Sequence, residues 1–302
     1  MFTRLLVPLD GSRLAEAALP VAERLALAFD AVMVLLHVVE RDARPTIHGE
    51  QHFTDHATAD NYLQALVEQA SVRGVQVSLH THDVPEGDVA ASIARHASEV
   101  HADLIVLCTH GSSGVRALLS GSIAQQVLQR GTTPVLLVRP PASGMSPPRF
   151  DPHTILVPLD GTVAAEVALG PATTLAMKLG ARLHLMMVVA TPETVRGDRA
   201  AVATLLPSAT RALLDIEQEQ ADDYLHAQAA RLHTAGLDVV TEVRRGDTAQ
   251  QLAGEAAEHG IDLLVASTHG RAGLQAVWAG STTARLLSRT TTPVLLLRTI
   301  EA

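Results

Sequence analysis

The sequence predicts an α/β fold of two tandem doubly wound domains, flavodoxin- or Rossmann-like, each with a five-stranded parallel sheet flanked by helices. Two observations support this prediction. Short aliphatic runs alternate with longer amphipathic stretches along the chain, a pattern typical of parallel strands buried between helices. The second half also repeats the first, because residues 5–12 read LLVPLDGS and residues 155–162 read ILVPLDGT. A repeat of about 150 residues has the size of one domain, so we expect two copies.

The first half alternates predicted strands with predicted helices. The strands are short and mainly aliphatic, at residues 5–9, 32–39, 75–79, 104–107 and 135–138. The helices fall near residues 13–29, 60–73, 88–98 and 122–129. Because parallel strands are joined by right-handed crossovers, ligand sites are expected at the carboxyl ends of the strands.

The second half repeats this order with an insertion. Its predicted strands lie at residues 155–159, 182–189, 238–243, 263–266 and 294–297. We place the domains at residues 1–140 and 151–302, joined by a linker at 141–150 that is rich in Pro, Ser and Gly. Residues 41–59 and 190–212 differ between the halves, and we expect them to form variable excursions near the mouths of the sites.

The composition narrows the classes of partner. A net charge of −9 and an aromatic content of 2% disfavour nucleic acid, whose phosphates need basic groups and whose bases need stacking partners. No apolar run is long enough for a membrane span, and the first strand begins too early to leave room for a signal peptide. The single cysteine, Cys108, excludes an intrachain disulfide framework. We therefore expect a cytoplasmic protein without a nucleic-acid or membrane partner.

A glycine-containing segment follows the fourth predicted strand of each half. The first reads Cys-Thr-His-Gly, then nine residues and Gly-Ser; the second reads Ser-Thr-His-Gly, then nine residues and Gly-Ser. Glycine lets a backbone approach a ligand closely, and the free N–H groups at a helix start bind anions. The candidate binding residues are Cys108, His110, Gly111, Gly121 and Ser122, and in the second half Ser267, His269, Gly270, Gly280 and Ser281. The alternative is a structural turn in which Ser122 and Ser281 cap helices.

An aspartate ends the first predicted strand of each half, Asp10 in one and Asp160 in the other. A carboxylate at the carboxyl end of a strand can hold ribose hydroxyls. The alternative is that each aspartate is the N-cap of the following helix, which would begin near Arg13 or Val163.

Together these motifs resemble the universal stress protein family over nearly all of both halves. The resemblance rests on the Pro-Leu-Asp-Gly motifs, Leu36–Val39, the Gly-Asp pairs at 87–88 and 246–247, and the Thr-His-Gly and Thr-Pro-Val-Leu-Leu segments. It implies a sensor or regulator of the stress response that binds ATP or AMP, with or without Mg²⁺. It further implies that Asp10 and Asp160 contact ribose, that Val38 and Val188 line the adenine pocket, and that the glycine segments hold phosphates.

The same resemblance carries one departure and one implication for assembly. The nucleotide-binding branch of the family has a signature resembling Gly-two-Gly-nine-Gly-Ser/Thr, and here Cys108 and Ser267 replace its first glycine. In the family, the last strands pair between subunits. The two halves of this chain are therefore expected to form a pseudo-dimer through their last strands, and two chains can form a homodimer.

Three alternatives stay open at this point. A family member without nucleotide would act through protein partners, which the loss of the first glycine favours. A slow ATP hydrolase is the second; no residue is predicted to be catalytic, and we expect at most a weak ATPase. A zinc-responsive protein would use His48, His52 and His56, which share one face if that segment is helical. Cys108 is expected to be a buried, unreactive thiol.

Overall fold

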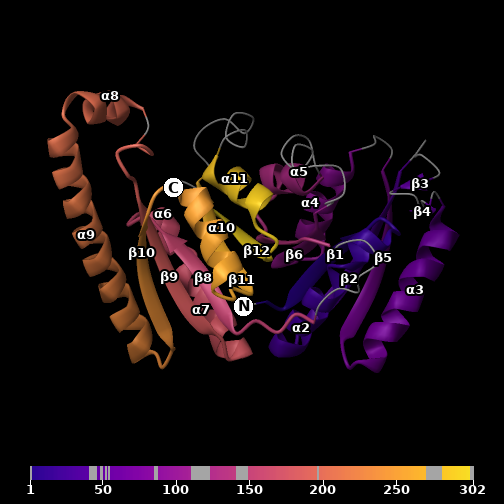
Figure 1. The fold of residues 1–302 in the computed structure, drawn as a ribbon. Helices are drawn as coiled ribbons and strands as arrows, with labels where there is room; N and C mark the ends of the chain where they lie inside the picture. Colours follow the sequence, from indigo (N-terminus) through magenta and orange to yellow (C-terminus); the bar gives the residue numbers. More distant parts are fainter. Residues whose placement is uncertain are drawn as a thin grey trace. The chain divides into compact units, whose positions relative to one another are not determined.

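The computed structural model describes residues 2–40, 46–47, 50–51, 53, 55–84, 88–109, 123–140, 149–195, 197–269 and 281–299. The chain divides into two compact units. Unit 1 comprises Met1–Asp151 and Pro293–Arg298, and unit 2 comprises Pro152–Thr292 and Thr299–Ala302. Both units are built from a sheet and flanking helices (Figure 1). The linker expected at 141–150 lies outside the described residues except for 149 and 150.

The sheet of unit 1 contains five parallel strands in the order β7-β6-β1-β2-β5. Their bounds are β1 (Arg4–Leu9), β2 (Val32–Glu40), β5 (Gln76–Val84), β6 (Leu104–Cys108) and β7 (Val135–Val138). If the five strands are numbered along the chain and the sheet is read from β5 to β7, the order is 3-2-1-4-5, which is the Rossmann order and not the flavodoxin order. The central strands β1 and β6 are almost completely buried, as their aliphatic sequences predict.

The helices of unit 1 follow the strands in alternation. They are α1 (Arg13–Glu16), α2 (Leu19–Phe29), α3 (His56–Val72), α4 (Val89–Glu99) and α5 (Ile123–Arg130). The single helix predicted near 13–29 is therefore two helices, and Pro20 lies in the first turn of the second, where its missing N–H has no intrahelical partner to lose. Strands β3 (Thr46–Ile47) and β4 (Glu50–Gln51) form a separate antiparallel pair.

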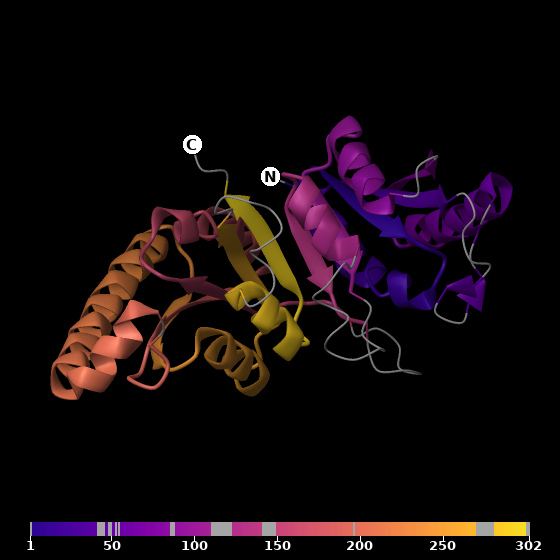
Figure 2. The same ribbon diagram turned by 90° about the horizontal axis from the view of Figure 1, so that it is seen from above.

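Unit 2 repeats the arrangement, with an additional helix and one longer helix after its second strand. Its parallel strands β8 (Thr154–Leu159), β9 (Arg182–Val189), β10 (Val239–Arg245) and β11 (Leu263–His269) have the order β10-β9-β8-β11. Its helices are α6 (Val163–Glu166), α7 (Leu169–Leu179), α8 (Asp198–Leu205), α9 (Pro207–Thr234), α10 (Thr248–Glu258) and α11 (Thr282–Arg289). The excursion at 190–212 contains α8 and the start of the 28-residue α9. Figure 2 shows α8 lying beside α9, against which it packs.

The last strand, β12 (Val294–Thr299), pairs antiparallel with β7 in the register Leu295↔Leu136, and its contacts place it with unit 1. The Arg298 guanidinium adds hydrogen bonds to the carbonyl oxygens of Gln129 (3.2 Å) and Gly131 (2.9 Å). The association of the two halves as a pseudo-dimer, and of two chains as a homodimer, stays a prediction. Among the described helices, none combines the length and apolar character needed to cross a membrane.

Candidate functional site

The strand order places one switch point in each unit. The chain leaves β1 toward β2 on one side and returns to β6 on the other, and unit 2 does the same with β8, β9 and β11. In sheets of this kind ligands bind in the crevice outside the carboxyl ends of the strands at that point. The residues that end β1 and β6, and β8 and β11, therefore define the candidate sites.

Asp10 and Asp160 occupy equivalent places at these switch points, directly after β1 and β8. Asp10 Oδ1 accepts hydrogen bonds from the backbone N–H of Ser12 (2.9 Å) and from its hydroxyl (2.6 Å). Asp160 Oδ1 accepts the same two bonds from Thr162, at 3.0 and 2.6 Å. The turn after the strand thus fixes one oxygen of each carboxylate.

The helix N-caps are Ser12 and Thr162, and the alternative that the aspartates cap these helices is wrong. The Ser12 hydroxyl oxygen accepts from Ala15 N–H at 3.2 Å, and Thr162 accepts from Ala165 N–H at the same distance. Each cap hydroxyl therefore donates to the aspartate and accepts from the helix. Each aspartate therefore accepts a hydrogen bond from the cap residue, and it orients the side chain that caps α1 or α6.

A second side-chain pair secures each of these short helices. Tyr62 of α3 donates to Glu16 at 3.0 Å, and Tyr224 of α9 donates to the equivalent Glu166 at 2.8 Å. Burial and the neighbouring Glu166 raise the pKa of the Tyr224 phenol, and the Asp160 charge adds to this effect. The protonated phenol is a permanent donor at neutral pH, so it holds α6 against α9.

The apolar positions predicted for the adenine pocket lie near the ends of the adjacent strands. Val38 in β2 is buried, with 7% of its surface exposed, whereas Val188 in β9 is half-buried. The residues at the switch points also differ in solvent exposure, and those of unit 2 are again the more exposed. Ser12 is completely buried and Asp10 half-buried, while Asp160 and Thr162 are exposed. The candidate site of unit 2 is therefore more open to solvent.

The residues that replace the first glycine end β6 and lie within β11. Cys108 is 7% exposed, and burial together with the Asp10 charge raises the pKa of its thiol to about 12. The predicted inert thiol fits this environment, because reaction requires the thiolate. Ser267 is half-buried. A side chain at the first-glycine position of unit 1 is thus accommodated inside the domain.

Much of each predicted phosphate-binding segment lies outside the described residues. The candidate binding residues that lie outside them are His110, Gly111, Gly121, Ser122, Gly270 and Gly280. His269 is the last residue of β11. Ser281 is described and is the N-cap of α11, where its side chain accepts from Ala284 N–H at 3.1 Å. The capping role considered for Ser281 is therefore present, and phosphate binding by these segments stays a prediction.

An ion pair that the sequence analysis did not identify braces the helices on either side of each glycine segment. Asp88 is the N-cap of α4 and pairs with Arg130 of α5. Asp247 is the N-cap of α10 and pairs with Arg285 of α11 at 2.5 Å. The Gly-Asp pairs of the two halves point to these aspartates, but the arginines lie 38 or more residues away in the sequence. Only the tertiary structure brings these residues together.

Phe53 lies against the candidate site of unit 1. A Cβ placed on Gly11, next to Asp10, would be 2.5 Å from Phe53 Cε2. The Phe53 ring also packs against the Tyr62 ring, at a centroid distance of 5.0 Å. The backbone carbonyl oxygen of Phe53 lies 3.2 Å from Nε2 of the buried His37. In unit 2, a Cβ placed on Gly161 has no described atom within 4 Å.

The candidate zinc ligands His48, His52 and His56 would share one face only on a helix, and the described residues of this segment do not form a continuous helix. Residues 46–47 and 50–51 form the paired strands β3 and β4, and α3 begins only at His56. A glycine at position 49 disfavours a continuous helix. His48 and His52 lie outside the described residues, so zinc binding by this segment stays a prediction.

One hollow of unit 2, of about 650 Å³, lies at the opposite end of the sheet from the candidate site. Its lining includes His153 and Thr154 before and at the start of β8, Arg182 at the start of β9, and Asp238 before β10. The Arg182 and Asp238 side chains form an ion pair at 2.7 Å. Because ligand sites of these folds lie at the carboxyl ends of the strands, we assign this hollow no part in the candidate site.

The strand order and the repeated switch-point aspartates define an α/β protein of the Rossmann type that carries its domain twice. The model of the universal stress protein family matches residues 1–139 and again residues 152–298, so the chain belongs to that family as a tandem member.

Individual relatives agree with this assignment. Universal stress protein YxiE of Bacillus subtilis is 32% identical over 151 residues, which cover 46% of this chain and 100% of YxiE. A universal stress protein of Mycolicibacterium smegmatis is 24% identical over 306 residues and matches 97% of this chain and 96% of its own length. The crystal structure of a universal stress protein from Archaeoglobus fulgidus has the same fold, with a TM-score of 0.70 at 17% identity over 98% of this chain and 96% of that chain.

Proposed function

We propose that this tandem universal stress protein binds an adenine nucleotide, ATP or AMP, at the carboxyl ends of the strands and acts as a sensor or regulator. The observation that carries the proposal is the repeated switch-point geometry. In both units an aspartate directly after the first strand has one oxygen fixed by the residue two positions later. A preoriented carboxylate is suited to accept hydrogen bonds from the two hydroxyls of a ribose.

The neighbouring side chains fit the other parts of such a ligand. Val38 and Val188 offer apolar surface to a base, in a chain whose aromatic content is only 2%. The glycine segments, with Ser122 and Ser281, would supply N–H and hydroxyl donors to phosphates, with or without Mg²⁺.

We further propose that unit 2 is the stronger of the two sites. Asp160 and Thr162 are exposed, and no described atom would lie within 4 Å of a Cβ on Gly161. In unit 1 the Phe53 ring lies against Gly11, so a nucleotide would have to displace it from its contacts with Tyr62. Displacing the ring uses binding free energy, which would lower the affinity of unit 1 relative to unit 2.

The first test is the nucleotide content of the freshly purified protein. The chain is denatured, released nucleotide is identified by chromatography, and ATP and AMP are titrated calorimetrically into the stripped protein. One strong site, with a weaker second one, is the expected result. A protein that contains no nucleotide and gives no heat with either ligand would favour the alternative in which the chain acts through protein partners.

Variants then locate the site. Asp160→Asn keeps an oxygen for the Thr162 bonds but removes the charge, and we expect it to weaken ATP binding by about tenfold or more, since hydrogen bonds to a charged group contribute about 1.5–3 kcal/mol. Gly280→Val should abolish binding in unit 2, as Gly121→Val should in unit 1. Asp223→Asn, on the exposed side of α9, is the matched control that should change nothing. ATP turnover that disappears in Asp10→Asn and Asp160→Asn would instead favour the slow hydrolase.

A further inference from the structure

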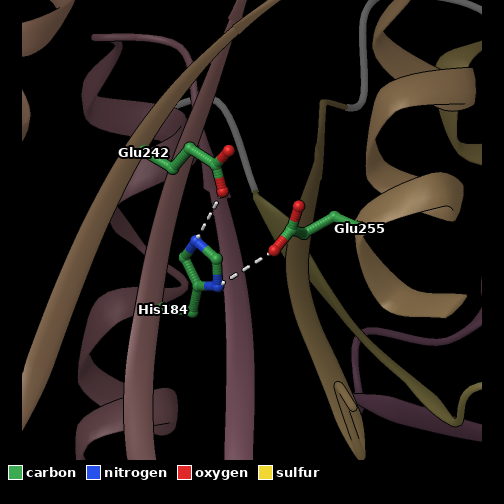
Figure 3. A group of neighbouring side chains, drawn as sticks. All are labelled: His184, Glu242 and Glu255. Atoms are coloured by element: carbon green, nitrogen blue, oxygen red, sulfur yellow. Dashed lines mark ion pairs between the residues drawn. The ribbon is translucent and has the colours of Figure 1, made fainter. Parts of the chain in front are cut away.

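Unit 2 contains a group of charged side chains on the α10 side of its sheet, away from the carboxyl-end aspartate. His184 of β9, Glu242 of β10 and Glu255 of α10 point toward one another (Figure 3). His184 Nε2 lies 3.3 Å from Glu242 Oε2, and His184 Nδ1 lies 3.5 Å from Glu255 Oε1. One ligand atom from each residue can be chosen so that all three lie within 4.8 Å of one another. His184 and Glu255 are buried, with Glu255 only 1% exposed.

Arg244 orients the two carboxylates without occupying the oxygens that face His184. Its Nε donates to Glu242 Oε1 at 2.6 Å, and its Nη2 donates to Glu255 Oε2 at 2.5 Å. The other oxygen of each carboxylate, Glu242 Oε2 and Glu255 Oε1, is the one directed at the imidazole. This arrangement resembles the outer shell of a metal site, in which a second group fixes the geometry of the ligands.

The charges of the group call for a further cation. The carboxylates of Glu242 and Glu255 face one guanidinium, that of Arg244, so these three side chains together carry a net charge of −1. A neutral imidazole has one N–H and can donate to only one of the two carboxylates that flank His184, which leaves its other nitrogen lone pair against an oxygen. Burial lowers the pKa of His184, although both glutamates act in the opposite direction. A metal ion would bind a ring nitrogen in its deprotonated form and would replace the unfavourable lone-pair contact.

We propose that His184, Glu242 and Glu255 form a binding site for a divalent transition-metal ion, with Zn²⁺ as its best representative. Zinc bonds to nitrogen and oxygen of about 2.0–2.2 Å in tetrahedral geometry place ligand atoms roughly 3.3–3.6 Å apart. One ion binds only one nitrogen of the His184 ring, and the candidate ligand atoms lie within 4.8 Å of one another, so small side-chain movements would bring them into this range. His259 lies beside this group, with its Nδ1 3.2 Å from Glu255 Oε1. An imidazole-containing set favours zinc over Mg²⁺ and Ca²⁺, which prefer oxygen ligands alone.

The equivalent positions of unit 1 carry different side chains. Glu242 pairs with Met186 as His80 pairs with Leu36, and Glu255 follows the N-cap Asp247 at the spacing at which His96 follows Asp88. Three imidazoles therefore gather in unit 1, with ring centroids of His80 and His96 5.0 Å apart and those of His82 and His96 5.9 Å apart. They provide no carboxylate pair, and they form the competing site against which the proposal is tested.

The test is a calorimetric titration of ZnCl₂ into the chelator-treated full chain, with MgCl₂ as a separate titrant. We expect a zinc site that Glu242→Gln and His184→Gln each weaken by more than about tenfold, the lower limit set by losses on removing even outer-shell partners. Glu242 is partly exposed, so Glu242→Gln should fold even if His184→Gln does not. His80→Gln and His96→Gln are the matched controls, and they should leave this site unchanged. A Co²⁺-loaded sample provides a second readout, because its visible spectrum should change in Glu242→Gln and His184→Gln and not in His80→Gln or His96→Gln.

Three results would overturn the proposal. The wild-type chain could fail to bind zinc, or could bind Mg²⁺ equally well. Zinc binding could survive unchanged in both Glu242→Gln and His184→Gln, which would move the ion to another segment, such as His48–His56. Binding could also be lost in His80→Gln and His96→Gln and kept in the unit 2 variants, which would assign the ion to the imidazoles of unit 1.

Discussion

The contact between Phe53 and Gly11 makes a quantitative prediction about two otherwise equivalent glycines. Gly11 and Gly161 both have positive φ, at +87° and +79°. Alanine at either position must adopt a left-handed conformation, which costs about 1–2 kcal/mol. At Gly11 the new Cβ would also lie 2.5 Å from one ring carbon of Phe53 and 2.8 Å from another, so the ring, which packs against Tyr62, must shift. Overpacking of this kind adds about 1–3 kcal/mol.

The experiment is a double-mutant cycle measured by urea unfolding, with hydrogen exchange in β1 and β8 reporting each unit separately. Gly11→Ala should destabilise unit 1 by about 2–5 kcal/mol, and Gly161→Ala should destabilise unit 2 by only about 1–2 kcal/mol. In a Phe53→Ala background the effect of Gly11→Ala should fall to that of Gly161→Ala. Gly161→Ala should be insensitive to that background. Equal effects of the two glycine substitutions, or an effect of Gly11→Ala that Phe53→Ala does not reduce, would refute the placement of the ring.

Further expected outcomes concern single groups. Tyr224→Phe removes only the hydroxyl that donates to the Glu166 carboxylate, so it should lower the free energy of unfolding by about 1.5–3 kcal/mol in a urea titration. Cys108 should react with an aromatic disulfide reagent at pH 8 far more slowly than a free thiol until the chain is unfolded, because burial raises its pKa to about 12; rapid reaction of the native protein would contradict this. The N–H of Ala91 and the Arg130 guanidinium hold the pKa of Asp88 below 3.8, so its stabilising contribution is complete above about pH 4 and is lost as the pH falls through the folded-state pKa. Asp88→Asn should therefore flatten the acid side of a plot of stability against pH, and an unchanged slope would argue against the bond.

The fold was predictable because its determinants are local. The aliphatic runs that become β1, β6 and β8 are buried along nearly their whole length, and a run of this kind has few alternatives to a central parallel strand. The prediction was less complete for β5, which extends to Val84 and not to residue 79. Its second part begins with four polar residues, His-Thr-His-Asp, and such a segment can pair as an edge strand without the apolar sequence of a central one.

The candidate site was predictable only in part. The repeated aspartates and glycine segments indicate where a ligand should bind, because they recur at fixed places relative to the strands. The roles of Phe53, Arg130 and Arg285 depend on contacts between segments far apart in the sequence. The group around His184 illustrates the same limit, since its ligands come from two strands and a helix. A histidine within an aliphatic strand and a glutamate and arginine alternating along β10 were the available signals, but their meeting is a property of strand register.

The hydrogen bonds of Tyr62 to Glu16 and of Tyr224 to Glu166 have a practical consequence for spectroscopy. The chain contains only two tyrosines, and these bonds place one in each unit beside the helix that follows the site aspartate. A sample isotopically labelled at tyrosine rings alone would therefore give two sets of resonances, assignable with a single Tyr→Phe variant. Each set would report the occupancy of its own half, so the filling of the two sites could be followed separately in one titration.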